Sequence, residues 1–339
     1  MNPCKVLALQ NVTWKCNWKC KHCYFRRFGK SWESGDTPLE VLKKQIDNGR
    51  ARGCDKVALC GKGEPMLHSR IEKIISYISE IGMKSLIITN GTAGVERYRK
   101  LYDLGLDHLQ VSMHGLGKTL DKITERGDAG ERQTKLLEWL NKENHPFRIN
   151  ITLQQLNYQE IPDIAEEGIR FGAFYVSFLN FLPHYHWKYH VKEIAVDPEL
   201  LVEPLEETME WLEKAGAFFT LRYFPMCMVK PNFWKYITNA RFVLFDPWEW
   251  EYGHYSKDVE KVWKVAVITG RKAGIKGEPC NSCLLKEHCG GWNRMYANAF
   301  NLRGLKSIKQ FPPELERAIN KRGGLFDLNP ANLLEGCAI

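Results

Sequence analysis

The 339-residue sequence lacks the features that would mark a membrane or secreted protein. It has no run of about 18 apolar residues, so we expect no membrane span. Its N-terminus has no basic segment followed by a long apolar one, so no signal peptide is indicated. It also lacks internal repeats and low-complexity linkers, and its length suits one large domain or two unequal ones.

The overall composition is that of an ordinary globular protein, with 44% hydrophobic and 26% charged residues. The net charge of +8 would permit an anionic partner. Eleven cysteines could suggest disulfides, but most of them cluster as CxxxCxxC and CxxCxxxxxC. Such clustering indicates metal binding in a reducing compartment, so we expect a cytoplasmic protein.

The first cysteine cluster comprises Cys16, Cys20 and Cys23, directly after the apolar run 6–12. Three soft thiolates suit an iron–sulfur cluster or zinc. Structural zinc requires a fourth protein ligand, and no further cysteine lies within the next thirty residues. Three ligands on a four-position centre would leave one iron open to a substrate.

Polar segments end the apolar runs that follow. GKGEP, at 61–65, follows the run 56–60; TNG ends the next run at 89–91, and QVSMHG ends the one after at 110–115. Together with CxxxCxxC, the order and spacing of these segments resemble the radical S-adenosylmethionine (SAM) family. GKGEP looks like the family's GGEP motif with Lys62 in place of the first glycine.

The resemblance implies a 4Fe–4S cluster held through three irons by Cys16, Cys20 and Cys23, with SAM chelated on the fourth iron. The reduced cluster would pass an electron to the SAM sulfonium, and cleavage would yield methionine and a 5′-deoxyadenosyl radical. The expected cofactor-binding residues are His22, Gly63, Glu64, Ser112, Arg126 and Asn150. Beyond the cluster we assign no catalytic residue.

For several of these residues a plain structural role stays open. Gly63 and Glu64 are expected to bind the methionine amino group, but glycine–glutamate–proline is also a simple turn. Ser112 and Asn150 are expected to bind the ribose and carboxylate, although buried polar groups also need protein partners. Arg126 suits the SAM carboxylate. His114 could be catalytic, yet it resembles a family position where histidine is often structural.

Strand-like runs alternate with helical patterns, which predicts βα units and a parallel sheet. The expected strands are residues 6–12, 56–60, 85–89, 108–112, 148–153 and 175–181. The expected helices are residues 38–52, 70–81, 95–104, 131–141, 161–171 and 198–215. This α/β pattern resembles the partial (β/α)6 TIM-type barrel of radical SAM enzymes, in which active-site residues lie at the C-terminal strand ends.

The second cysteine cluster comprises Cys280, Cys283 and Cys289. It resembles the SPASM and Twitch auxiliary-cluster extensions of radical SAM enzymes. A full SPASM pattern would place a further cysteine at Asn293, so we expect one auxiliary 4Fe–4S cluster. We favour Cys227 as its fourth ligand over Cys337 in the tail, while an open iron and a zinc site remain alternatives.

A further strand-like run lies at 218–223, and the alternating βα pattern stops there, so we expect a division of the chain near residue 222. Residues 1–222 would form the radical SAM partial barrel, and residues 223–339 a smaller SPASM/Twitch-like auxiliary-cluster domain. The aromatic and histidine-rich stretch 184–190 is expected to be a loop over the barrel mouth rather than a metal site.

Basic residues crowd the first cysteine loop, where they could be merely solvated or could dock an acidic electron donor such as flavodoxin or ferredoxin. They are Lys15, Lys19, Lys21, Arg26, Arg27 and Lys30. No basic–aromatic module stands out, so we do not expect nucleic acid as a partner.

The main functional hypothesis is an enzyme that abstracts hydrogen from its substrate for oxidation, cross-linking or rearrangement. Radical SAM enzymes that modify ribosomal peptides commonly carry a small peptide-binding domain before the barrel, and only fifteen residues precede Cys16. A small metabolite or nucleotide therefore competes with a peptide as substrate. The alternative class is a non-enzymatic zinc or iron–sulfur protein that binds nucleic acid.

Overall fold

The computed structural model describes residues 5–9, 11–23, 25, 35–51, 53–183, 190–237, 274–286 and 289–313. Its centre is a sheet of seven strands whose spatial order follows the chain. Every neighbouring pair of strands is parallel. The strands are β1 (Lys5–Leu9), β2 (Cys54–Leu59), β3 (Lys84–Thr89), β4 (His108–Ser112), β5 (Phe147–Leu153), β6 (Tyr175–Asn180) and β7 (Phe218–Arg222).

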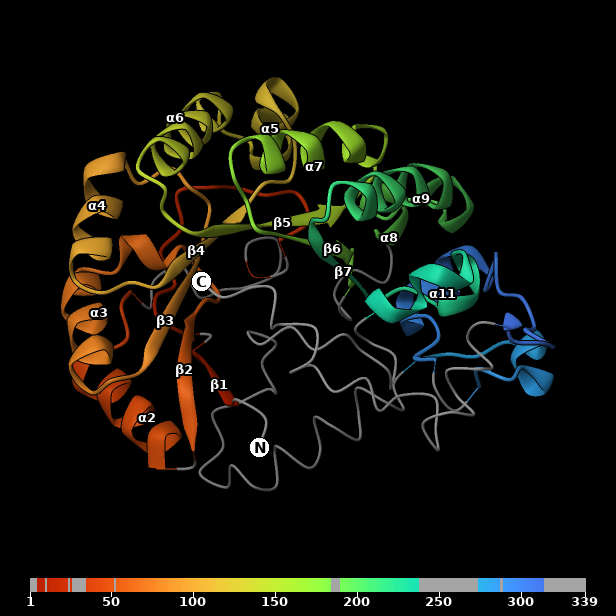
Figure 1. The fold of residues 1–339 in the computed structure, drawn as a ribbon, viewed down its shortest axis with the longest axis horizontal. Coiled ribbons are helices and arrows are strands. Elements are labelled where there is room, and N and C mark those ends of the chain that lie inside the picture. The colour runs from red at the N-terminus through yellow and green to blue at the C-terminus, as the bar shows by residue number, and fades with distance from the viewer. Residues whose placement is uncertain are drawn as a thin grey trace.

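Helices cover the convex face of the curled sheet, so the molecule is a half-barrel with strands inside and helices outside (Figure 1). The barrel helices are α2 (Leu39–Ala51), α3 (Ile71–Glu80), α4 (Val95–Asp103), α5 (Gly117–Thr124), α6 (Ala129–Lys142), α7 (Ile161–Arg170), α8 (Val191–Ile194) and α9 (Pro198–Lys214). The predicted α/β partial barrel is therefore confirmed.

Helix α3 illustrates why the sequence forms these elements. Its isoleucines 71, 74, 75 and 78 recur at helical spacing and are all buried. The helix stops at Gly82, whose φ of 74° lies in the left-handed region that glycine adopts without steric cost. The chain then returns directly into β3.

The structure adds strand β7 and the helices α5 and α8 to the predicted barrel. The run 218–223, predicted as a strand outside the six barrel strands, is β7, which continues the sheet through parallel pairs such as Leu179 with Arg222. The sheet therefore has seven strands rather than six. Helix α5, between β4 and α6, was not predicted, and it contacts the first cysteine loop.

The described residues after β7 share the core of the barrel. Phe224, Trp234, Trp292 and Tyr296 belong to the same buried cluster as the strands and helices. Helix α11 (Arg294–Phe300) packs against α8, and the Tyr296 hydroxyl donates to the Val196 carbonyl. Both parts are thus continuous in packing, and the division near residue 222 stays a prediction.

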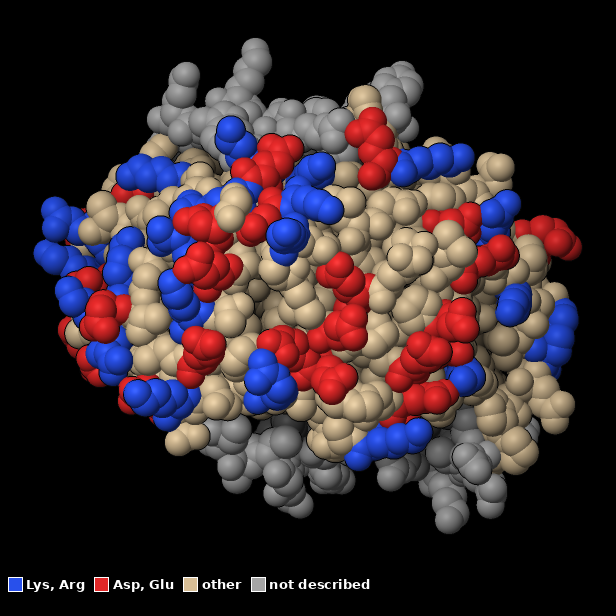
Figure 2. All heavy atoms as spheres, turned by 90° about the horizontal axis from the view of Figure 1, so that it is seen from above, with Lys and Arg blue, Asp and Glu red and all other residues tan. Residues whose placement is uncertain are grey.

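Charge is unevenly distributed on the surface despite the net charge of +8. On the face seen in Figure 2, acidic side chains gather on the α7 and α9 side, while lysine and arginine are denser toward α3 and α4. This face therefore does not carry the continuous basic patch expected of a nucleic-acid surface.

No helix in the described part of the chain is long and apolar enough to cross a membrane. The cytoplasmic location stays a prediction. Several further predictions concern residues outside the described ranges: residues 184–189 of the aromatic stretch, Arg26, Arg27, Lys30 and Cys337.

Candidate functional site

The first cysteine loop follows β1 and rests on α5. Its backbone is fixed by hydrogen bonds from Lys19 N to Thr124 O (2.8 Å) and from Lys21 N to Ile123 O (2.9 Å). Trp18 is only 2% exposed and anchors the loop in a small apolar cluster with residues of α5 and α6. This packing leaves Cys16, Cys20 and Cys23 partly exposed, where a metal cluster could reach them.

The GKGEP turn after β2 lies in direct contact with this loop. Glu64 N donates to Lys15 O at 2.7 Å. A Cβ atom added to Gly63 would lie 2.2 Å from Lys15 O and 2.8 Å from Thr13 O, so no larger residue fits without moving the loop. Glycine is therefore required here by the close approach of two backbones.

The Glu64 carboxylate is turned into the protein. It accepts hydrogen bonds from Thr89 Oγ1 (2.8 Å), Asn90 N (2.7 Å) and Met66 N (3.1 Å). Burial raises the pKa of Glu64 to about 7, although these hydrogen bonds act in the opposite direction. The side chain therefore joins the GKGEP turn to the end of β3, and its predicted contact with SAM stays a prediction.

Asn17, between the first two cysteines, connects the loop to the end of β3. Its Oδ1 accepts from Asn90 Nδ2 at 2.7 Å, and its Nδ2 donates to Thr92 Oγ1 at 2.9 Å. Arg126 donates from an Nη atom to Asn17 O at 3.4 Å, and its guanidinium also pairs with Asp128. The predicted SAM-binding arginine therefore lies beside the cysteine loop.

Ser112 and Asn150 lie side by side at the ends of β4 and β5, where they are register partners. Gln133 on α6 donates to both Asn90 O (3.0 Å) and Ser112 O (3.1 Å), joining the ends of β3 and β4. Asn150 Oδ1 is buried without a hydrogen-bond partner among the described residues. A buried amide oxygen needs a donor, so this atom suits contact with a bound cofactor.

His22 is close to Gln154 and His114. Its Nδ1 lies 3.0 Å from Gln154 Nε2, and its ring meets that of His114 edge-on at 4.6 Å. Burial lowers the pKa of His22 to about 4. His114 Nδ1 accepts from Thr152 N at 3.1 Å, which agrees with the structural role that its position suggested.

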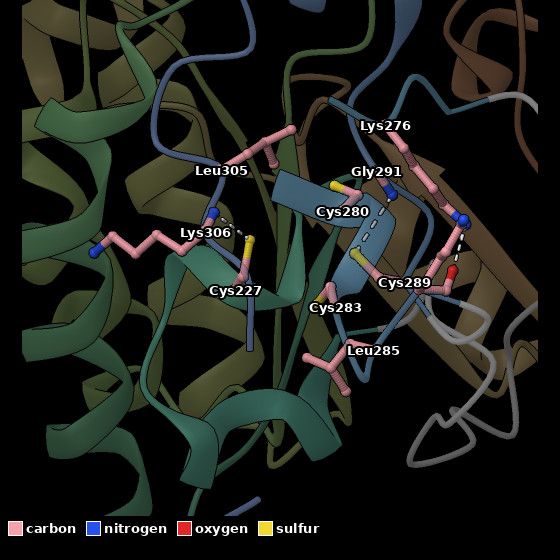
Figure 3. Close-up of a pocket in the computed structure, with 10 residues that line it drawn as sticks. Cys227, Lys276, Cys280, Cys283, Leu285, Cys289, Gly291, Leu305 and Lys306 are labelled. Atoms are coloured by element: carbon pink, nitrogen blue, oxygen red, sulfur yellow. Dashed lines mark hydrogen bonds between the residues drawn. The ribbon is translucent and has the colours of Figure 1, made fainter. Parts of the chain in front are cut away.

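The second cysteine set is brought together from two distant segments. Cys227 lies in a 3₁₀ turn (Met226–Met228) after β7, and it lines one cavity with Cys280, Cys283 and Cys289 (Figure 3). Cys337 lies outside the described residues. The predicted association of Cys227 with the other three is therefore seen in the fold, while its role as a ligand stays a prediction.

Backbone N–H groups point at three of these sulfurs. Each sulfur accepts one at 3.4 Å: Cys227 from Lys306, Cys283 from Ile308 and Cys289 from Gly291. Hydrogen bonds to cysteine sulfur tune iron–sulfur clusters. Three of the four predicted ligands thus accept the kind of backbone hydrogen bond that such a cluster uses.

The glycines after Cys289 are needed for this geometry. Ile275 and Trp292 pair through two backbone hydrogen bonds of 2.7 and 3.1 Å. Gly291, directly before Trp292, has φ of 68°, and a Cβ there would lie 2.6 Å from Ile275 O. The Gly290–Gly291–Trp292 sequence therefore holds Cys289 against the 274–277 segment, a pairing that sequence spacing did not predict.

The four cysteines of the second cavity could in principle hold an iron–sulfur cluster or zinc. Among the described residues, no group of three or more histidine, cysteine, aspartate or glutamate side chains could hold a metal ion. Zinc binds each thiolate at about 2.3 Å, which crowds its ligands, whereas an iron–sulfur cluster separates them by its own width. Burial raises the pKa of Cys227 to about 11, so binding must displace its proton.

Taken together, the fold and the first site define a class of protein: a partial α/β barrel with a three-cysteine loop among the polar C-terminal strand ends. The sequence model of the Radical SAM superfamily matches residues 11–168, from the start of this loop into α7. Residues 11–168 therefore carry a domain of this superfamily, and the superfamily implies an enzyme with a 4Fe–4S cluster and SAM. The non-enzymatic alternative is therefore not supported.

Curated relatives resemble part of the chain. It is 30% identical over 167 residues to Fe-coproporphyrin III synthase of Methanosarcina barkeri, covering 48% of this chain and 41% of that protein. It is 27% identical to the probable GTP 3′,8-cyclase of Methanococcus maripaludis over 63% of this chain and 68% of that protein. It is 25% identical to PqqA peptide cyclase of Methylorubrum extorquens over 58% of this chain and 51% of that protein. The matched regions thus span between 41% and 68% of the lengths of these relatives.

Solved structures share the fold over most of the chain. Streptococcus suis SuiB bound to S-adenosylmethionine has a TM-score of 0.61 at 19% identity, covering 91% of this chain and 76% of that one. The structure of anSMEcpe with AdoMet and the Cp18Cys peptide has a TM-score of 0.59 at 15% identity, covering 91% of this chain and 93% of that one. The likeness extends beyond the residues that the family model matches.

Proposed function

We propose that this enzyme reductively cleaves SAM at a 4Fe–4S cluster held by Cys16, Cys20 and Cys23, and then abstracts hydrogen from its substrate. The observation that carries this proposal is the contact between the GKGEP turn and the cysteine loop, where Gly63 and Glu64 meet Lys15 backbone to backbone. A cofactor bound to the cluster would lie against this turn.

The chain's own residues would bind and orient SAM. When bound, the cluster supplies the electron that splits SAM into methionine and a 5′-deoxyadenosyl radical. The backbone of Gly63 and Glu64 would receive the amino group, while Arg126 beside the loop would receive the carboxylate. Asn150, whose Oδ1 has no hydrogen-bond partner among the described residues, would receive a hydroxyl of the ribose together with its neighbour Ser112.

We further assign an auxiliary 4Fe–4S cluster to Cys227, Cys280, Cys283 and Cys289. Their common cavity and the N–H groups aimed at their sulfurs support this assignment. Four protein ligands would leave no iron open to substrate, so such a cluster would accept an electron during substrate oxidation rather than hold the substrate. Residues 223–339 would then form the auxiliary-cluster domain and residues 1–222 the barrel.

The proposed substrate is a small metabolite, a nucleotide or a peptide. The names of the relatives cover these classes, with Fe-coproporphyrin III, GTP and the PqqA peptide among them. SuiB has also been solved with its precursor peptide SuiA. For the electron donor we propose an acidic protein, because Lys19 and Lys21 are exposed on the cysteine loop.

Anaerobic reconstitution tests the proposal without knowledge of the substrate. The purified protein should be brown and hold about eight irons if both clusters assemble. Adding dithionite and SAM should then release 5′-deoxyadenosine and methionine. A colourless zinc-loaded protein, or an iron-loaded protein that leaves SAM intact, would refute the proposed activity.

A further inference from the structure

Lys62 stands where the GGEP motif has a glycine, and its ammonium group packs on aromatic rings of the cysteine loop. Nζ lies 3.8 Å from the centroid of the Trp14 ring and 5.8 Å from that of Phe25. The two rings contact each other edge-to-face, with centroids 6.4 Å apart. A cation over the face of tryptophan is attracted by the ring quadrupole, and the attraction grows as water is removed.

The two aromatic residues mark the ends of the cysteine motif. Trp14 lies two residues before Cys16, and Phe25 lies two residues after Cys23. Their contact therefore brings the two ends of the cysteine loop together. Lys62, on the neighbouring GKGEP turn, contacts the aromatic ring at each of these ends. Partial burial also lowers the pKa of Lys62, as expected for an ammonium group that has lost some of its hydration.

The backbone on either side of Lys62 is held to the same stretch of chain. Gly61 forms an isolated antiparallel bridge with Asn11, and Glu64 N donates to Lys15 O. These contacts fix the Lys62 backbone beside the loop. These backbone contacts do not involve the Lys62 side chain, which adds a separate interaction with both ends of the loop.

We propose that Lys62 is a positioning residue that locks the SAM-binding turn onto both ends of the cluster loop through its positive charge. This inference rests on the proposed function, because it takes the loop as the cluster site and the turn as the SAM site. Its consequence is that cluster retention and SAM affinity both depend on a cation at position 62.

Three substitutions separate charge from chain length. Lys62→Met keeps the length and removes the charge, Lys62→Gly restores the residue of the resembled motif, and Lys62→Arg keeps a cation that can stack on tryptophan. On reconstituted protein, we would measure SAM affinity from the change in the cluster's electron paramagnetic resonance signal, and iron release in the presence of a chelator. Thermal unfolding of the apo-protein controls for a general loss of stability.

We expect Lys62→Met and Lys62→Gly to weaken SAM binding and speed iron release by about three- to thirtyfold, the range of a cation–π contact. Lys62→Arg should stay close to the wild type. Trp14→Leu should give a similar loss that does not add to that of Lys62→Met, because both variants remove the same contact.

Unchanged binding and iron release in Lys62→Met, additive effects with Trp14→Leu, or an arginine variant as impaired as the methionine variant would each overturn the inference. Failure of the proposed function would look different, because the wild type itself would then bind no iron–sulfur cluster or leave SAM uncleaved. If the wild type holds the cluster but does not bind SAM, the iron-release rates alone decide whether Lys62 has the proposed positioning role.

Discussion

Asn90 Nδ2 donates a 2.7 Å hydrogen bond to Asn17 Oδ1, which ties the end of β3 to the loop between the first two cysteines. Asn90 is itself fixed, because its backbone N–H donates to Glu64 and its Oδ1 accepts from Thr92. The position of the cysteine loop is therefore set by the strand ends of the barrel as well as by its own sequence.

Replacing Asn17 with alanine should loosen this loop. The variant loses the hydrogen bonds to Asn90 and Thr92, each worth about 0.5–1.5 kcal/mol. We expect iron release in the presence of a chelator to be faster than in the wild type by about an order of magnitude. Asn232→Ala, at an exposed 3₁₀ turn, is the matched control, and equal release rates in both variants would contradict the anchoring role of Asn17.

Gly63→Ala tests the contact between the GKGEP turn and the loop. The new methyl group would meet Lys15 O at 2.2 Å, and the atoms that it meets are backbone, so the loop must shift. We expect less reconstituted iron and weaker SAM binding, both measured by absorption spectroscopy. Gly127→Ala is a suitable control because a Cβ there meets nothing within 4 Å. A Gly63→Ala protein that binds SAM normally would show that the two segments can separate without loss.

The sequence predicted the elements of this site better than their contacts. The cysteine loop and the polar strand ends could be located because parallel barrels place functional residues at C-terminal strand ends. Helix α5 was missed because it spans only Gly117–Thr124 and begins with glycine, a poor helix former. The Asn17–Asn90 and Lys62–Trp14 contacts join residues distant in sequence, and no local periodicity records such pairs.

Glu64→Gln should change how stability depends on pH. The folded-state pKa of Glu64 is raised from 4.5 to about 7, so the folded protein binds this proton more tightly than the unfolded chain. The stability contributed by that proton is full below pH 4.5 and is lost as pH rises toward 7. The difference in free energy of unfolding between wild type and Glu64→Gln should therefore decline over this range, as measured by urea denaturation of the apo-proteins.

The same variant tests the predicted role of Glu64 in SAM binding. Its three hydrogen bonds within the protein already hold the turn, and a hydrogen bond to a charged group is worth about 1.5–3 kcal/mol. We expect weaker SAM binding with unchanged cluster content. SAM affinity equal to that of the wild type would limit Glu64 to holding the turn.

Replacing Cys16, Cys20 and Cys23 together with alanine should remove one cluster and abolish SAM cleavage. The auxiliary cluster should keep its absorption, because its four cysteines come from segments after β7. Iron content should fall to about half of that of the reconstituted wild type. Loss of all cluster absorption would show that the two sites are not independent, and would contradict the proposed division of the chain.

The fourth ligand of the auxiliary cluster is tested by comparing Cys227→Ala with Cys337→Ala. Cys227 lines the cavity with Cys280, Cys283 and Cys289, and its sulfur already accepts a hydrogen bond from Lys306 N. Pro225 restricts the backbone just before it, so little ordering is needed to present the thiolate. We therefore expect Cys227→Ala to lose the auxiliary cluster or make it labile, while Cys337→Ala keeps the iron content and spectrum of the wild type. The reverse result would assign the ligand to the tail. If neither variant changes the cluster, one of its irons is open, and direct binding of the substrate there would replace electron transfer as its role.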